Sequence, residues 1–217
     1  MTKVYPKSVI APLVSSEKQR FSGESTTTSG RNPNPVVLTV WKKSLLFSCD
    51  GFTVYDTNGN LVFRVDNYAA GNKAEVVLMD AAGHSLVTIR RKRPSLTECW
   101  TVYDGETAVN PRFSATKHVS FRNGKSLAHV MSTTGSSKKR VAYEIEGCYA
   151  QRCCVVYDDK RRRVAEIKRK EAAVGGVAFG GDVFRLVVQP EIDSTVAMAL
   201  VVLLDQMFGG SSRRFYA

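Results

Sequence analysis

The side chains best suited to chemistry in this chain are positive charges concentrated in two short segments. One cluster comprises Arg90, Arg91, Lys92 and Arg93, and the other comprises Lys160, Arg161, Arg162, Arg163, Lys168, Arg169 and Lys170. They supply nearly the whole formal net charge of +11, because Glu166 is the only acid among them. A concentrated positive field attracts phosphate-bearing partners such as anionic lipid head groups or nucleic acid, and also acidic protein surfaces. The alternative is that these charges only keep strand faces soluble.

The cysteines and histidines form no recognisable metal or disulfide pattern. No two of the five cysteines have C-x-x-C spacing, and the three histidines are scattered along the chain. An odd number of cysteines, with Cys153 directly beside Cys154, indicates free thiols in a reducing compartment. No apolar segment near the N-terminus has the pattern of a secretion signal. We therefore expect no metal and no cofactor, and a protein of the cytoplasm or nucleus, peripheral to the plasma membrane at most.

The sequence carries no signature of a known enzyme mechanism. Gly124-Lys125-Ser126 resembles the end of a phosphate-binding loop, but Val119 stands where that motif requires its first glycine. No G-x-S-x-G elbow is present either. A Cys–His dyad that forms only in space stays open at this point. We expect a protein that is not an enzyme.

The elements that must position these cations are short strands. From Val36 onwards, runs rich in Val, Phe, Tyr and Thr alternate with turn residues. The predicted strands cover residues 36–40, 45–48, 52–55, 61–65, 75–79, 86–91, 100–103, 118–122, 126–131, 140–146, 154–157, 163–168 and 184–189. Asn58-Gly59 and Asn123-Gly124 suit tight hairpin turns, which indicates antiparallel neighbours.

Alternation along these strands predicts which side chains face the interior. Val87, Ile89, Ala165 and Ile167 are expected to point inward, and Arg90, Lys92, Glu166, Lys168 and Lys170 outward. The pattern Tyr55-Asp56, Val62, Val65 recurs about a hundred residues later as Tyr157-Asp158, Val164, Ile167. This recurrence indicates two related hairpins, or a chance similarity.

Residues 192–208 have the pattern of a helix that is apolar on every side. Asp193 or Ser194 can cap its start and Gly209-Gly210 ends it, with no polar residue between Val196 and Leu204. A membrane span needs about 20 apolar residues, so the helix is expected in a protein core. About a dozen strands close into a barrel with a central hole that a helix fills. The predicted fold is mainly β, an antiparallel closed barrel of about twelve strands around a buried C-terminal helix.

The predicted organisation is a disordered tail over residues 1–35, a barrel domain over 36–208 with its core helix at 192–208, and a C-terminal tail over 209–217.

Several segments resemble the plant LURP-one-related family. The first hairpin, from Phe52 to Val65, is similar, and so are Trp100 before Val102-Tyr103, the run Cys154 to Tyr157, and the end from Phe184 to Gln206. The resemblance covers about 36–208. It implies the tubby C-terminal-like fold, which phospholipid scramblases share, together with a plant source and a link to defence signalling. It also implies a relation to tubby proteins, which bind phosphoinositides and act as membrane-tethered transcription regulators. Scramblases keep an acidic calcium-binding segment near the helix, where this chain has only Glu191, Asp193 and Asp205.

These observations lead to one site hypothesis and two rivals. The hypothesis is a non-enzymatic module, expected to be a monomer, that binds anionic phosphoinositide head groups. Its proposed contacts are Arg90, Lys92, Arg93, Arg161, Arg162, Lys168 and Lys170. One rival is a protein-binding scaffold. The other is a DNA-binding regulator, which is disfavoured because the only convincing helix is buried rather than free to enter a major groove.

Overall fold

The structure is a computed structural model that describes residues 34–46, 49–68, 75–92, 99–106, 109–118, 126–133, 140–171 and 180–209. Apart from residues 34, 35 and 209, the tails predicted over 1–35 and 209–217 lie outside this part of the chain.

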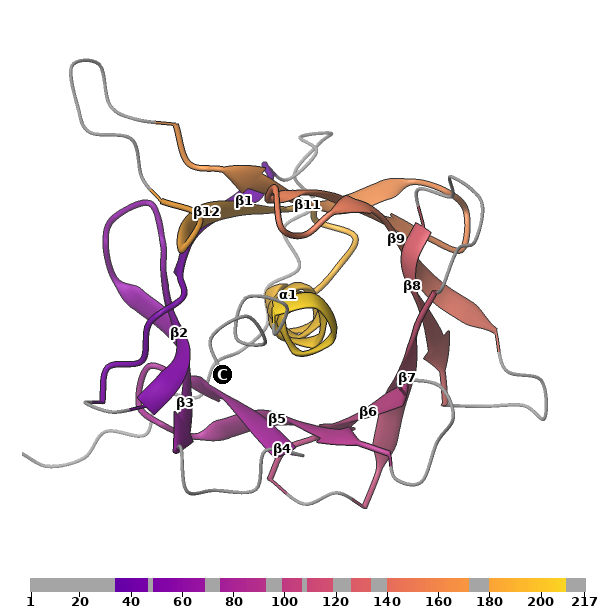
Figure 1. The fold of residues 1–217 in the computed structure, drawn as a ribbon, viewed down its shortest axis with the longest axis horizontal. Helices are drawn as coiled ribbons and strands as arrows, with labels where there is room; N and C mark the ends of the chain where they lie inside the picture. The colour runs from indigo at the N-terminus through magenta and orange to yellow at the C-terminus, as the bar shows by residue number, and fades with distance from the viewer. Residues whose placement is uncertain are drawn as a thin grey trace, which may run out of the picture. The chain divides into compact units, whose positions relative to one another are not determined.

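The described residues form twelve strands and one helix. The strands are β1 (Val36–Trp41), β2 (Cys49–Tyr55), β3 (Leu61–Tyr68), β4 (Glu75–Asp80), β5 (Ser85–Arg91), β6 (Cys99–Asp104), β7 (Pro111–Lys117), β8 (Ser126–Ser132), β9 (Val141–Cys148), β10 (Cys153–Asp158), β11 (Arg163–Arg169) and β12 (Val183–Val188), and the helix is α1 (Ser194–Phe208). Each strand pairs antiparallel with the strands before and after it, and β1 pairs with β12 to close the ring. Figure 1 shows the ring end-on with α1 inside it. The predicted fold class is confirmed.

The barrel interior is built mainly by alternation of buried and outward-facing residues along the strands. Val40 of β1 lies opposite Phe184 of β12 and Val54 of β2, and all three side chains are completely buried. Val87, Ile89, Ala165 and Ile167 are buried as the alternation predicts, whereas Arg90, Lys92 and Lys168 are exposed. One face of every strand therefore belongs to the core, and the exposed cations of β5 and β11 lie on the outer face.

Helix α1 is held inside the barrel by its apolar surface and capped at its start by Asp193. The Asp193 carboxylate accepts hydrogen bonds from the backbone N–H groups of Thr195 (2.9 Å) and Val196 (3.2 Å). Because the backbone of Asp193 is extended rather than helical, the helix begins at Ser194 and not at the predicted residue 192. Every residue from Val196 to Leu204 is buried, and so is Met207. A helix of this length, about 22 Å, spans the height of the barrel.

The strand predictions failed in two places: one predicted strand is absent at its described residues, and one observed strand was not predicted. Leu45 and Leu46, predicted to open a strand, form an exposed bend instead, and residues 47–48 lie outside the described part. Strand β7 was missed, because it starts at a proline and buries only Phe113 and Ala115. His118 follows the end of β7, and the rest of the strand predicted at 118–122 lies outside the described residues.

The two ends of the barrel differ in what they carry. Consecutive strands run in opposite directions, so all odd-numbered strands end at the same rim, where α1 also ends. We call it the C-terminal rim; its described residues include 41–46, 90–92, 117–118, 149–152, 168–171 and 180–182. The opposite end, which holds the turns after β2, β4, β6 and β10, is the N-terminal rim.

Candidate functional site

Several polar side chains of the C-terminal rim hold the end of α1. The Lys42 ammonium lies 2.8 Å from the Asp205 carboxylate, which also accepts a hydrogen bond from the Tyr149 hydroxyl at 3.2 Å. Lys117 donates to the Met207 carbonyl at 3.0 Å and sits over the Phe208 ring. The last turn of α1 carries no basic residue of its own, so the barrel wall supplies the cations that its negative end favours. Lys42 and Lys117 therefore have a structural role.

The two predicted basic clusters do not form one patch. Strands β5 and β11 are six positions apart in the order of the twelve-stranded ring, at the bottom and top of Figure 1. Arg90 on β5 forms an ion pair with Glu75 of the neighbouring β4, and Lys92 follows β5 on the exposed rim. Arg93 lies outside the described residues. Because the two clusters lie on opposite sides of the barrel, one small head group cannot contact both.

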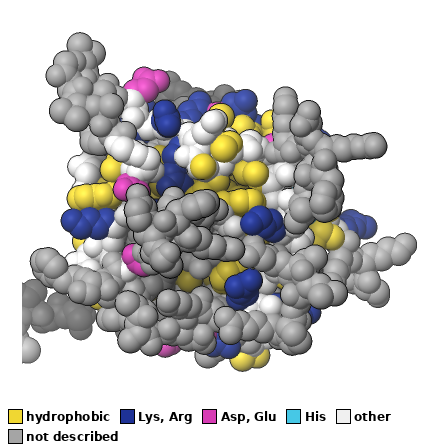
Figure 2. Space-filling model, in the orientation of Figure 1, with side chains coloured by type: hydrophobic (Ala, Val, Ile, Leu, Met, Phe, Trp, Pro, Cys, Tyr) yellow, Lys and Arg dark blue, Asp and Glu magenta, His cyan; other side chains and the backbone are white. Residues whose placement is uncertain are grey.

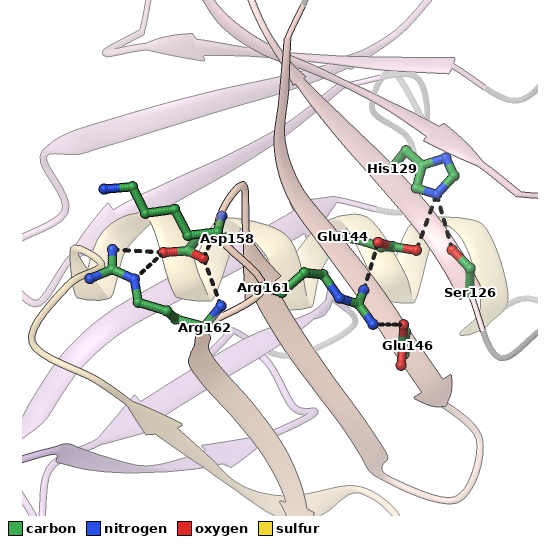
Figure 3. A network of polar contacts seen from close by, with 8 residues as sticks. Ser126, His129, Glu144, Glu146, Asp158, Arg161 and Arg162 are labelled. Atoms are coloured by element: carbon green, nitrogen blue, oxygen red, sulfur yellow. Dashed lines mark hydrogen bonds and ion pairs between the residues drawn. The ribbon is translucent and has the colours of Figure 1, made fainter.

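Arg161 and Arg162 lie at the N-terminal rim and are engaged by carboxylates of the protein itself. The Arg161 guanidinium contacts Glu144 at 2.7 Å and Glu146 at 2.9 Å, both on β9 (Figure 3). The same guanidinium lies over the Tyr157 ring. Arg162 pairs with Asp158 at 2.7 Å in the same figure. A head group would have to displace these pairs, so both arginines are poorly placed as a lipid site.

The turn that presents Arg161 recurs in two other hairpins. In each, the backbone N–H of an aspartate donates to the carbonyl four residues later; the pairs are Asp56 and Asn60, Asp80 and His84, and Asp158 and Arg162. The fourth turn position has positive φ and is Gly59, Gly83 and Arg161, respectively. The first and third turns belong to the repeat seen in the sequence, so its two copies share one hairpin geometry. Arg161 tolerates a backbone angle for which glycine is better suited.

Lys168 and Lys170 lie near the C-terminal rim on or just after β11. Lys168 is 3.0 Å from Glu166 on the same strand, and its side chain is 52% exposed. Directly opposite Lys168, across the ladder, is Arg185 of β12, which is also exposed. Arg185 in turn lies opposite Thr39 of β1. The outer face of β11, β12 and β1 thus carries two adjacent cations.

An exposed apolar loop begins at the end of β1 and turns toward β3, where the Ser44 hydroxyl donates to the Asp66 carboxylate. Trp41, the last residue of β1, is 40% exposed, and Leu45 and Leu46 after it are 47% and 37% exposed. The Lys43 ammonium lies 5.2 Å from the centre of the Trp41 ring. Trp41 is opposite Val183, two residues before Arg185, so Trp41 and Arg185 are diagonal neighbours on the outer face of the barrel. We define the Trp41 surface as Trp41, Lys43, Leu45, Leu46, Lys168 and Arg185.

Basic side chains also occur elsewhere around the barrel. In the end-on view of Figure 2, lysine and arginine side chains appear at several separated places among apolar ones. The Trp41 surface is distinguished by its combination of cations with large exposed apolar groups.

One group of side chains resembles a catalytic triad in composition. Ser126 and Glu144 flank His129, at 3.2 Å and 3.5 Å (Figure 3). Both contacts involve the same ring nitrogen, Nε2. A triad needs the hydroxyl on one nitrogen and the carboxylate on the other, so that the imidazole can accept a proton while the acid orients it. This arrangement therefore cannot act as a triad.

Neither a metal-binding cluster nor a membrane-spanning helix occurs among the described residues. No group of three or more His, Cys, Asp or Glu residues is arranged to hold a metal ion in this part of the chain. None of its helices has the length and apolar character needed to cross a membrane.

Comparison with known proteins places the chain in a family. The model of the family described as LURP-one-related matches residues 36–205. The chain belongs to the LURP-one-related family. Protein LURP-one-related 8 of Arabidopsis thaliana is 53% identical over 214 residues, covering 97% of this chain and 100% of that protein. LURP-one-related 17 of the same plant is 47% identical, covering 79% and 82%. A crystal structure of an Arabidopsis thaliana protein, 26% identical, matches 80% of this chain and 91% of its own with a TM-score of 0.59.

Sequence reasoning missed Trp41, Lys43 and Arg185 as site candidates. The signal was present: two lysines and two leucines directly follow a tryptophan at a strand end, and Arg185 interrupts an apolar strand at an outward position. The longest charge runs are a poor guide to the site, because several of their members are paired with carboxylates.

Proposed function

We propose that this LURP-one-related protein is a non-enzymatic module that docks on anionic membranes through the Trp41 surface. The observation that carries the proposal is the exposure of three large apolar side chains, Trp41, Leu45 and Leu46, within six residues, with Lys43 between them and Arg185 diagonal to Trp41. Phosphoinositide head groups are the ligand class that the resemblance to tubby C-terminal-like proteins implies. The same resemblance implies a role in plant defence signalling, which such docking would serve.

The apolar part of the surface suits the boundary between head groups and acyl chains. Tryptophan is favoured there because its ring is apolar and its indole N–H can still bond to water or phosphate. Leu45 and Leu46 extend the same loop and can enter the acyl region, as the apolar residues of peripheral anchors do. The other strongly exposed large apolar residues in the described part, Val36, Val109 and Val141, lie singly on the N-terminal rim.

The charged part supplies attraction to phosphate. Lys168 and Arg185 are directly opposite on neighbouring strands, and like charges in that position repel each other unless an anion lies between them. Glu166 offsets part of this repulsion by pairing with Lys168, and Asp182 is an exposed acid on the same rim. Each Lys or Arg near an anionic surface contributes about 1 kcal/mol to binding. Lys43, Lys168 and Arg185 therefore act with the apolar loop rather than alone.

The test is co-sedimentation of the full chain with vesicles of neutral lipid, of neutral lipid with phosphatidylserine, and of neutral lipid with phosphoinositide, at low and physiological salt. We expect saturable binding that requires anionic lipid. The double variant Lys43→Gln with Arg185→Gln should bind about thirtyfold more weakly, because two contributions of about 1 kcal/mol are lost. Trp41→Ala should weaken binding to the same vesicles and leave the salt dependence in place.

Matched controls come from the opposite rim. Arg140→Gln removes one exposed charge there, and Val109→Ser removes an apolar group that is 73% exposed. Both should bind like the unaltered protein. Equal losses in these controls and in the Trp41 surface variants would reject this site. Absence of binding to every vesicle, or stronger binding to duplex DNA with a steep salt dependence, would reject the function and favour the scaffold or DNA-binding rival.

A further inference from the structure

Two cysteines face each other where β9 turns into β10. Cys148 ends β9, Cys153 begins β10, and the two are register partners in the antiparallel ladder. Residues 149–152 form the turn that joins them. The next pair along, Cys154 with Gly147, has the opposite orientation, and Cys154 is buried in the core. Cys148 and Cys153 therefore both point to the outer face of the barrel.

The spacing of such a pair matches that of a disulfide. Directly opposite residues in antiparallel strands have Cα atoms about 4.5–5.5 Å apart. Disulfides join residues whose Cα atoms are about 4.4–6.8 Å apart. Cys153 is exposed, so an oxidant can reach its thiol. Cys148 is half-buried directly opposite, so its thiol can reach an oxidised Cys153.

The third thiol of this hairpin is not a competitor. Burial raises the pKa of Cys154 to about 12, so its thiol stays protonated and unreactive at neutral pH. Cys153 and Cys154 are also adjacent on one strand, with side chains on opposite faces. Among the cysteines of the hairpin, only Cys148 is placed to pair with Cys153.

We propose that Cys148 and Cys153 form a redox modification site that a peroxide converts into a disulfide. The Cys153 sulfur attacks a peroxide oxygen, which gives a sulfenic acid and, from hydrogen peroxide, one water. The Cys148 sulfur then displaces the sulfenic hydroxyl, which leaves as a second water. The two thiols together lose two protons and two electrons, and the peroxide is reduced to two waters. A dithiol reverses the reaction by exchange.

The turn closed by this bond is part of the C-terminal rim. Tyr149 bonds to Asp205 of α1, and the Arg152 guanidinium lies between the rings of Tyr149 and Phe184. Arg152 also has positive φ and donates to the Gly181 carbonyl at 2.7 Å. Oxidation would fix the ends of a turn that contacts both α1 and β12.

The experiment treats the reduced, folded full chain with a small excess of hydrogen peroxide and then alkylates the remaining thiols. We expect two of the five cysteines to be lost and the intact mass to fall by two hydrogens. Trypsin cuts after Arg140, Arg152 and Lys160, so the disulfide should appear as peptide 141–152 linked to peptide 153–160. Dithiothreitol should separate them.

Variants make the result decisive. Cys148→Ser and Cys153→Ser should each abolish the linked peptide, and Cys99→Ser, which lies on β6, should leave it unchanged. Circular dichroism confirms that each variant is folded. The proposal is overturned if peroxide produces no linked peptide. It is equally overturned if the product is a disulfide-bonded dimer or Cys153 sulfinic acid, or if Cys148→Ser still loses two thiols.

Discussion

Replacing Leu200 with alanine tests whether α1 is the centre of the core. Leu200 lies in the middle of α1, is 1% exposed, and is surrounded on all sides by the closed ring of strands. Truncation removes the methyl groups and the branching carbon of the side chain. The space they leave can close only if α1 or the wall moves, and a barrel with every strand paired on both sides has little freedom to collapse.

The expected cost is the upper part of the range for buried leucines. Leu→Ala substitutions in cores cost about 2.7–5.0 kcal/mol, and the cost rises with the volume of the cavity that remains. We therefore expect Leu200→Ala to lower the free energy of unfolding by about 4 kcal/mol. For a domain of this size, that corresponds to a decrease in Tm of about 8–16 °C.

The assay is urea unfolding followed by far-ultraviolet circular dichroism, with Leu45→Ala as the matched control. Leu45 is 47% exposed, so its truncation should change the free energy of unfolding by less than about 0.5 kcal/mol. An equal m-value in both variants shows that the same surface unfolds. A loss below about 1 kcal/mol for Leu200→Ala, or equal losses in the two variants, would refute a tightly enclosed helix.

Three further predictions concern other parts of the barrel. Gly51→Ala should destabilise the fold by more than about 2 kcal/mol in urea unfolding, because the added Cβ would lie 1.8 Å from the Val65 carbonyl oxygen on β3. Burial raises the pKa of Tyr149, so the neutral hydroxyl stabilises the fold below the unfolded pKa of about 10, and this contribution is lost as pH rises beyond it. Tyr149→Phe should therefore reduce the fall of the urea midpoint between about pH 9 and 11. A side-chain hydrogen bond from Asn60, followed by its backbone N–H, lowers the pKa of Asp56, so this contribution is present above about pH 4 and is lost as pH falls through the depressed value. Asp56→Asn should therefore weaken the decline of the urea midpoint below about pH 4.

The fold could be predicted because its two periodicities are clear. Alternation marks strands such as β5, where Val87 and Ile89 point inward, and the unbroken apolar run from Val196 to Leu204 marks a helix that must be enclosed. The strand predictions fail where the alternation is weak, or where a loop has the apolar composition of a strand. Strand β7 carries few apolar residues, and the Leu45-Leu46 pair has the composition of a strand but none of the pairing.

The site was harder to predict because it depends on which strands become neighbours. Charge runs in the sequence do not show that β5 and β11 end up on opposite sides of the ring, since that follows only from closure. The runs also do not show that Glu144 and Glu146 engage Arg161, because β9 carboxylates meet the turn after β10 only in the folded barrel. Arg185 gains its importance from a single register pair with Lys168.

The most direct test of membrane docking through the Trp41 surface uses the tryptophan fluorescence of the chain. It has two tryptophans: Trp41, which is exposed, and Trp100, which is buried and should give a constant background. With phosphoinositide vesicles, we predict a blue shift of the emission and quenching by brominated acyl chains. Both effects should disappear in Trp41→Phe and persist in Trp100→Phe. Saturable vesicle binding with no change in Trp41 emission, or the same response in both variants, would contradict the account.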